Sequence, residues 1–266
     1  MQKILFVTLL TIGLFLTACS HQEKANVVRI GTIAGPETKL MEVAKKVALQ
    51  QYGLHVHIVT FTDYNIPNQA LAEKNIDVNA FQHKPFLESQ IKAYGYHFAI
   101  VGNTFLYPMG LYSSKIKSLS QLKPNDEVAI PNDPSNEARA LLLLQKAKLL
   151  TLKPNATINA TTQDIATNPE HLKIISLDAA ELPRTLNDVT LAAINTNYAV
   201  PAGLTPSNAL FLEDTGSLYM NVFVARIKDQ HEKKIIELVN AYHSQAVLNE
   251  AKKIFGNNAI AGFSIK

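Results

Sequence analysis

The sequence contains a single cysteine, Cys19, among its 266 residues. One thiol cannot form an intrachain disulfide, so the core has to stabilise the fold without covalent cross-links. A lone cysteine also excludes the clusters of thiolates that bind structural zinc. The chain is nevertheless long enough to bury a sizeable core, either in one unit or in two medium-sized lobes.

The motifs of several enzyme classes are absent as well. There is no GxSxG nucleophile turn, no HExxH motif, no GxGxxG dinucleotide motif and no GxxxxGK[ST] phosphate-binding loop. The formal net charge is only +3 and no block of basic residues occurs, which argues against nucleic acid as a partner. We therefore expect a protein that is not an enzyme, with no catalytic residues, no metal site and no cofactor.

The N-terminus has the pattern of an export signal. Residues 1–3 carry a positive charge, an uncharged apolar run follows at 4–16, and small residues precede Cys19. The run is too short for a comfortable membrane span, so residues 1–18 are predicted to be a signal peptide. Cys19 resembles the cysteine of the bacterial lipobox, which implies lipidation with chains such as palmitate and a polar tether at 19–26. The alternative is an uncleaved anchor or a coincidental cysteine.

From residue 27 onward, strand patterns alternate with helix patterns. Strands are predicted at 27–32, 54–61, 76–81, 97–104, 127–130, 172–177 and 189–195. Helices are predicted up to Gly53, at 66–73, at 86–94, at 137–145, and around 232–242 and 246–255. This alternation is typical of βαβ units, so we expect an α/β fold with parallel sheets whose C-terminal strand ends face the ligand.

Two extended stretches interrupt the alternation. Residues 103–113 include Pro108 and Gly110 and are interpreted as a crossover to a second lobe, while 218–225 is a candidate return strand. Two α/β lobes joined by two extended crossover strands form a periplasmic-binding-protein-like clamp. The expected division is a first lobe at 27–110, a second lobe at 111–203, and a return to the first lobe with C-terminal helices at 204–266.

A polar turn that leads into a helix, within residues 127–145, is the strongest candidate for ligand binding. Asp133 is a natural N-cap, and Pro134 suits the first helical position. Arg139 and Asn136 lie three residues apart, on one face of the first turns. The guanidinium can grip a carboxylate with two hydrogen bonds while the amide donates a third, next to the positive end of the helix dipole. The alternative is an ordinary capped helix with a solvated arginine.

Further polar and aromatic residues cluster where predicted strands end. They are Tyr64 after the second strand, Phe81 and His83 at the third, Asn195 at the end of 189–195, and Asn221 in the return strand. Each one alone is a weak signal, because a phenylalanine there is usually core and an asparagine is usually a turn residue. Their shared location on both lobes is what predicts a site between the lobes.

Several segments together resemble the methionine-binding lipoproteins, the substrate-binding components of the bacterial methionine ABC importer. The segments are NAFQHKP at 79–85, VGNTF at 101–105, PNDPSN at 131–136, LLLLQK at 141–146 and INT at 194–196. The resemblance covers essentially the whole mature chain, with the segments in the same order. It implies two lobes that close over a free amino acid and deliver it to the permease and ATPase subunits of the importer.

The resemblance also implies a role for each candidate residue. Arg139 and Asn136 would clamp the ligand carboxylate, Asn195 and Asn221 would contact the amino-acid head group, and Tyr64, Phe81 and His83 would wall the thioether. A thioether is polarizable and favours aromatic faces, which fits these walls. The implied ligand is L-methionine, with D-methionine left open. The implied protein is a monomer, lipid-anchored to a membrane of the cell envelope and facing the periplasm or the cell exterior.

The sequence departs from this family pattern in two places. Glu137 and Ala138 stand where an apolar residue and a glycine are expected, and Glu137 is predicted to face solvent. The segment 187–194 is slightly short for the family. The alternative functions are binding of another small amino acid or a methionine-containing dipeptide, or a metal-binding lipoprotein in which His55, His57 and His83 converge.

Overall fold

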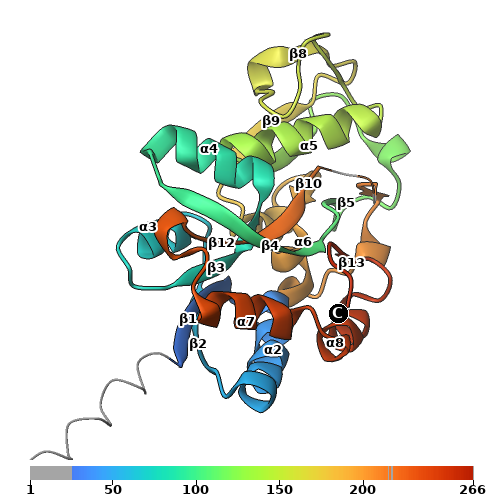
Figure 1. Ribbon diagram of the computed structural model, residues 1–266. Helices are drawn as coiled ribbons and strands as arrows, with labels where there is room; N and C mark the ends of the chain where they lie inside the picture. The colour runs from blue at the N-terminus through green and yellow to red at the C-terminus, as the bar shows by residue number, and fades with distance from the viewer. Residues whose placement is uncertain (1–25, 215, 217, 266) are drawn as a thin grey trace, which may run out of the picture.

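The computed structural model describes residues 26–214, 216 and 218–265, which form two lobes, each a β-sheet with helices packed against it (Figure 1). The predicted signal peptide and Cys19 lie outside the described residues. Within the described part of the chain, no helix is long and apolar enough to cross a membrane. The strand order of the first sheet is β13 (Ile260–Ala261), β4 (Phe98–Leu106), β12 (Met220–Arg226), β3 (Val78–His83), β1 (Val27–Ile33) and β2 (His55–Phe61).

The first lobe begins with the predicted β–α–β unit. β1 runs parallel to β2 on one side and to β3 on the other. Between β1 and β2, α2 (Pro36–Tyr52) begins with Pro36 and ends at Gly53, whose φ of 61° is left-handed and suits glycine. Because these three strands are parallel, their C-terminal ends meet at one edge of the sheet. α3 (Pro67–Ala72) and α4 (Lys84–Tyr94) follow β2 and β3, respectively.

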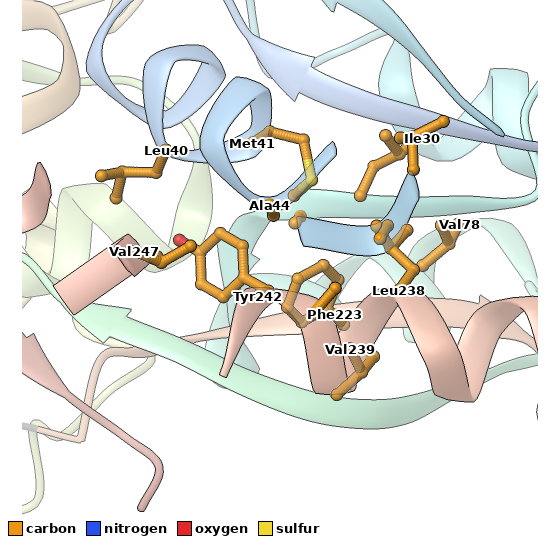
Figure 2. Packing of buried hydrophobic residues seen from close by; sticks show 14 of the residues in the cluster. Ile30, Leu40, Met41, Ala44, Val78, Phe223, Leu238, Val239, Tyr242 and Val247 are labelled. Carbon is orange, nitrogen blue, oxygen red and sulfur yellow. The ribbon is translucent and has the colours of Figure 1, made fainter. Parts of the chain in front are cut away.

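The core of the first lobe is formed by α2, α7 (Lys233–Tyr242) and α8 (Gln245–Phe255) on one face of the sheet (Figure 2). Leu40 and Met41 of α2, Leu238 of α7 and Phe223 of β12 have no exposed surface. Burying a side chain of this size stabilises the fold by roughly 1.5–3 kcal/mol. This packing fixes α2 on the sheet, with the first turn of the helix close to the edge where the strands end.

The second lobe is a five-stranded sheet in the order β11 (Phe211–Leu212), β5 (Gly110–Tyr112), β10 (Leu191–Ile194), β6 (Glu127–Pro131) and β9 (Lys173–Leu177). α5 (Pro134–Lys146) follows β6 as predicted, and the side chain of Asp133 caps it by accepting from the Asn136 N–H. Leu141 and Leu144 of α5 are buried in the core of this lobe. β5 runs antiparallel to β10 and β11, so this sheet, like the first, is mixed rather than purely parallel.

The remaining segments of the second lobe contain little regular secondary structure. The chain after α5 forms only the short hairpin of β7 (Thr151–Leu152) and β8 (Ile165–Thr167), and α6 (Thr196–Ala199) is a single turn. Short 3-10 turns make up several connections, at Leu119–Gln121, Thr162–Asp164, Leu182–Asn187, Val200–Ala202, Pro206–Asn208 and Ile227–Asp229.

Two connections join the lobes. β4 of the first sheet continues through residues 107–109 into β5 of the second, and the chain returns from β11 of the second sheet to β12 of the first. The predicted fold class, a periplasmic-binding-protein-like clamp of two α/β lobes, is confirmed. The exact lobe boundaries stay a proposal. Sheet membership places the return to the first lobe after Leu212, later than the expected start at residue 204, because β11 still pairs with β5.

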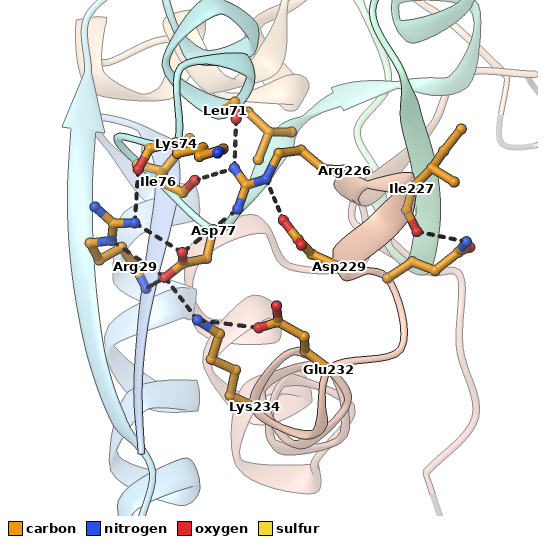
Figure 3. A network of polar contacts seen from close by, with 11 residues as sticks. Arg29, Leu71, Lys74, Ile76, Asp77, Arg226, Ile227, Asp229, Glu232 and Lys234 are labelled. Carbon is orange, nitrogen blue, oxygen red and sulfur yellow. Dashed lines mark hydrogen bonds and ion pairs between the residues drawn. The ribbon is translucent and has the colours of Figure 1, made fainter. Parts of the chain in front are cut away.

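A cluster of charged side chains holds the opposite edge of the first sheet (Figure 3). Asp77, just before β3, pairs with Arg29 of β1 at 3.0 Å, with Lys234 of α7 at 3.5 Å and with Arg226 of β12 at 3.8 Å. Burial by itself would raise the pKa of Asp77. Hydrogen bonds from Arg29 and the charges of Lys234 and Arg29 outweigh burial and hold the pKa below its ordinary value.

We expect Asp77→Asn to lower the free energy of unfolding by about 1–3 kcal/mol at pH 7, because three cations lose their shared anion. A depressed pKa contributes stability above the unfolded value of 3.8, and this contribution is lost as pH falls through the folded value. The difference from wild type should therefore shrink below pH 3.8. Urea unfolding at pH 7 and pH 3 measures it. Glu88→Gln, which breaks an exposed pair with Lys84, is the matched control and should change stability by less than about 0.5 kcal/mol. An equal loss for both variants would contradict this reading of the cluster.

Candidate functional site

The structure brings all seven predicted site residues to one cavity between the lobes. From the first lobe come Tyr64, Phe81, His83 and Asn221, and from the second come Asn136, Arg139 and Asn195. Six of them end or follow a parallel strand, whereas Asn221 lies at the start of the antiparallel strand β12, which places it at the same end of the sheet. That these residues bind a ligand stays a prediction.

Five further residues line the cavity, and the sequence analysis assigned none of them to the site: Gln82, Phe86, Tyr107, Thr196 and Asn197. Two of them, Gln82 and Thr196, lie in segments that carried the family resemblance and directly beside a predicted site residue, so including the sequence neighbours of each candidate would have found these two. Tyr107 lies in the crossover between β4 and β5, and Asn197 lies in the first turn of α6. Neither position shows a pattern of its own in the sequence.

One wall of the cavity is aromatic. The ring of Tyr64 lies 6.0 Å from that of Phe81 and 5.8 Å from that of Phe86, measured between centroids. The rings of Phe81 and Phe86 are 5.8 Å apart and meet edge to face. The imidazole of His83 meets Phe86 edge to face at 6.2 Å. Such a wall favours an apolar or polarizable group.

His83 is a neutral imidazole whose two nitrogens are both in use. Burial, and next the charge of Arg139, lower the pKa of His83 to about 3. Its Nδ1 accepts a hydrogen bond from the Phe86 N–H at 3.1 Å, so the neutral ring carries its proton on Nε2. This Nε2–H donates to Asn136 Oδ1 at 3.2 Å, which links the two lobes. His83 is therefore a positioned wall of the cavity with no nitrogen left for a metal.

The amide of Asn136 is committed inside the protein. Its Nδ2 donates to the carboxylate of Asp133, with 2.9 Å to Oδ2. Its Oδ1 accepts from His83 and also from Asn195 Nδ2 at 2.9 Å. The assignment of oxygen and nitrogen is fixed, because a flipped amide would direct its oxygen at a carboxylate. The sequence predicts that this amide donates to a ligand carboxylate, whereas in the structure it donates to Asp133 and orients Asn195.

Arg139 already has an anionic partner, Glu213, which the sequence pattern does not predict. Nε donates to Glu213 Oε1 at 3.0 Å and Nη2 donates to Oε2 at 2.5 Å, with side chains only 3% and 11% exposed. Nη2 also donates to the Tyr107 carbonyl at 2.9 Å, and the guanidinium carbon lies 4.4 Å from the centre of the Tyr219 ring. Nη1 has no hydrogen-bond partner among the described residues, and Arg139 lines the cavity, so this edge of the guanidinium is the one available to a ligand. A buried cation needs a counter-ion, but the sequence does not say which acid supplies it.

Three asparagines have hydrogen-bonding atoms available to a ligand, and these include both acceptors and a donor. The Nδ2 group of Asn221 donates to Glu37 Oε1 at 3.1 Å and to the Phe81 carbonyl at 3.4 Å, so Asn221 can offer only its Oδ1 as an acceptor. Asn195 Oδ1 and Asn197 Nδ2 are buried polar atoms that find no partner among the described residues. The cavity therefore offers acceptors on Asn221 and Asn195, and donors on Asn197 and Arg139.

The lobes are joined across the cavity in this structure. Tyr64 Oη donates to Asn197 Oδ1 at 2.7 Å, and Tyr198 Oη donates to the Thr62 carbonyl at 3.3 Å. Together with the bond between His83 and Asn136, these contacts describe a clamp in a closed arrangement. Opening the clamp has to break them, so each is a candidate for control of ligand access.

Two further predictions from the sequence concern Glu137 and the histidines of β2. Glu137 is half-buried and accepts from the Thr162 N–H at 3.2 Å, so the expectation that it faces solvent is wrong. The backbone N–H that Glu137 binds belongs to Thr162, and no local sequence pattern predicts that this segment packs against the start of α5. His55 and His57 are exposed on β2, whereas His83 is buried. The described residues contain no group of three or more side chains suited to a metal ion.

Comparison with known proteins agrees with the family resemblance and with the fold. Residues 28–263 match the family model described as NlpA lipoprotein. The chain is 47% identical over 255 residues to the D-methionine-binding lipoprotein MetQ of Salmonella typhi, covering 94% of each. It is 60% identical to the solved ABC transporter periplasmic substrate-binding protein of Coxiella burnetii, which superposes with a TM-score of 0.86 over 88% of this chain and 100% of that one. A nutrient binding protein from Burkholderia cenocepacia, solved bound to methionine, is 46% identical, with a TM-score of 0.87 over 89% of this chain and 100% of that one. The chain belongs to the NlpA lipoprotein family.

Proposed function

We propose that this protein is a substrate-binding lipoprotein of an ABC importer, which captures methionine between its lobes and delivers it to the membrane permease. Several relatives whose sequences match over most of the chain are named for methionine binding, and the family is one of binding proteins rather than enzymes. The partners in this proposal are L-methionine, D-methionine if the cavity accepts it, and the permease and ATPase subunits of the importer.

The observation that carries the proposal is the pairing of opposite polar groups with an aromatic wall in one buried cavity. An amino acid is a zwitterion, so burying it requires donors for its carboxylate and acceptors for its ammonium. Arg139 Nη1 supplies a cationic donor, and the amide oxygens of Asn195 and Asn221 supply acceptors. The rings of Tyr64, Phe81 and Phe86 then suit a thioether side chain.

The proposed location of the protein rests on Cys19, which lies outside the described residues. We propose that the mature chain begins at Cys19, carries acyl chains there and is anchored to a membrane by them, with the lobes facing the periplasm or the cell exterior. We further propose that the protein acts as a monomer. The two lobes of one chain already enclose the cavity, so a second copy is not needed to complete the site.

We expect L-methionine to raise the melting temperature of protein that has been stripped of endogenous ligand by unfolding and refolding. A ligand that binds only the folded state stabilises it by ~4 kcal/mol at a thousandfold excess over Kd, or roughly 8–16 °C for a chain of this size. Differential scanning fluorimetry with L-methionine, D-methionine, glycyl-methionine, norleucine and alanine measures the effect and ranks the ligands. Zinc chloride is included because a metal-binding lipoprotein was the alternative. A shift with zinc and none with methionine would contradict the proposal, and a larger shift with alanine would favour another small amino acid.

A further inference from the structure

A buried carboxyl group is hydrogen-bonded to Asn221, which lines the cavity, and it forms no ion pair with any residue that the structure describes. Glu37 is the second residue of α2, in the first turn of the helix, and is only 5% exposed. Its Oε1 accepts from Asn221 Nδ2 at 3.1 Å. Its Oε2 is buried and has no hydrogen-bond partner among the residues that the structure describes.

Other buried carboxyl groups of this protein are compensated. Glu213 pairs with Arg139, and Asp77 lies among three cations. Asp133, whose neighbour Asn136 lines the cavity, accepts from the Asn136 backbone and side-chain amides and from the Ser135 hydroxyl. Glu37 differs from them because its second oxygen, Oε2, is buried without a hydrogen-bond partner among the described residues. An uncompensated buried oxygen of this kind is a feature that a ligand can satisfy.

The groups that face Glu37 from the neighbouring elements are neutral. They are Asn221 of β12, Tyr107 of the crossover, Tyr242 of α7, Tyr64 after β2 and Tyr198 of α6. Burial raises the pKa of Glu37 to about 8, and the hydrogen bond from Asn221 opposes this only in part. Near neutral pH, the carboxyl group of the empty protein is therefore mostly protonated.

We propose that Glu37 is the positioning residue and counter-charge for the α-ammonium group of the ligand, and that methionine capture drives a proton from Glu37 into solvent. This inference rests on the proposed function. The bond from Asn221 Nδ2 to Glu37 fixes the amide so that Oδ1 is the acceptor offered to the ammonium. Glu213 already forms an ion pair with Arg139. The ammonium group of the ligand therefore gains an anionic partner of its own only when Glu37 ionises. The proton balance is one neutral carboxyl converted to a carboxylate, and one proton released, per ligand bound.

The pH dependence of affinity follows from this balance. Below pH 8, binding has to expel the proton, so affinity should rise by up to about tenfold per pH unit as pH increases, until the carboxyl group of the empty protein is itself ionised near pH 8. The titration of the other neighbours does not give this dependence. The tyrosines titrate well above this range, and His83 titrates near 3.

The test is calorimetric titration of the stripped full-length protein with L-methionine at pH 7 in buffers of different ionisation enthalpy. The dependence of the measured enthalpy on the buffer enthalpy gives the number of protons released. Wild type should release about one proton per methionine, because most of the carboxyl population is protonated at that pH. Glu37→Gln keeps the size of the side chain and an oxygen for Asn221. It should bind with no proton release, and its affinity should be flat between pH 5.5 and pH 8 and at least about tenfold weaker than wild type at pH 8.

Glu42→Gln is the matched control, because Glu42 lies on the same helix but is exposed. It should release the same number of protons as wild type. Binding of methionine without proton release by wild type would overturn the inference while leaving the proposed function intact, and this measurement needs no variant to fold. Proton release that persists in Glu37→Gln would also overturn it. If wild type gives no binding heat with methionine in any buffer, and no thermal shift, the proposed function itself fails.

Discussion

Arg139→Ala is expected to abolish binding of every amino acid that the protein accepts, and also to destabilise the empty protein. Arg139 is the one cationic side chain among the described residues that line the cavity, so a bound carboxylate would lose a partner worth about 3–5 kcal/mol for a buried pair. The same substitution leaves Glu213 nearly buried without its cation and removes the guanidinium from the Tyr219 ring. We therefore expect a loss of about 3 kcal/mol in the free energy of unfolding without ligand. An interpretation from sequence alone, in which this arginine serves only the ligand, predicts no such loss.

A double variant separates these two roles. In Arg139→Met with Glu213→Gln, both charges are replaced by neutral groups of similar volume, which is often nearly neutral for a buried pair. The double variant should recover most of the stability but none of the methionine binding. Arg184→Ala, at a side chain that is 79% exposed, is the control and should change neither quantity measurably. Calorimetry and urea unfolding on the four proteins provide the data. Normal methionine binding by Arg139→Ala would remove this residue from the site.

The sequence predicted those parts of the fold that local chemistry determines. α2 and α4 end at Gly53 and Gly95, and both glycines adopt the left-handed conformation. The Asp133 cap and the start of α5 at Pro134 were predicted from the preferences of single positions, and the structure confirms both. The rule that parallel strands align their C-terminal ends accounts for six of the seven candidates in the cavity, whereas Asn221 reaches it from the start of the antiparallel strand β12.

Partner choice between distant segments could not be predicted in the same way. Glu213 pairs with Arg139 across 74 positions in sequence, and Glu37 meets Asn221 across 184. Hydrophobic periodicity and helix caps do not predict such pairs, since in the sequence each of these side chains resembles an ordinary surface residue. The structure of the irregular segments in the second lobe could not be predicted for a similar reason. The chain between α5 and β9 is held by contacts such as the one from Thr162 to Glu137, rather than by any propensity of its own.

Asn136→Leu is expected to lower both the stability of the empty protein and its affinity for methionine. The amide of Asn136 accepts from His83 and Asn195, and leucine leaves both of these buried donors without a partner and without room for water. Each unsatisfied buried group costs about 1–3 kcal/mol, so unfolding should become easier by about 3 kcal/mol. Methionine should bind at least roughly 30-fold more weakly, because Asn195 is no longer oriented and the bond that joins the lobes is lost.

Asn136→Asp distinguishes the contributions of this amide more sharply. A carboxylate at position 136 can still accept from His83 and Asn195, but it faces the carboxylate of Asp133, where the wild-type amide donates. Burial already raises the pKa of Asp133, and a second carboxylate would raise it further, so the pair should take up a proton as pH falls. Stability of this variant should therefore recover toward wild type between pH 7 and pH 5, while Asn136→Leu should show no recovery. If the amide served only to donate to a ligand carboxylate, both variants would lose methionine binding but would unfold like wild type at every pH.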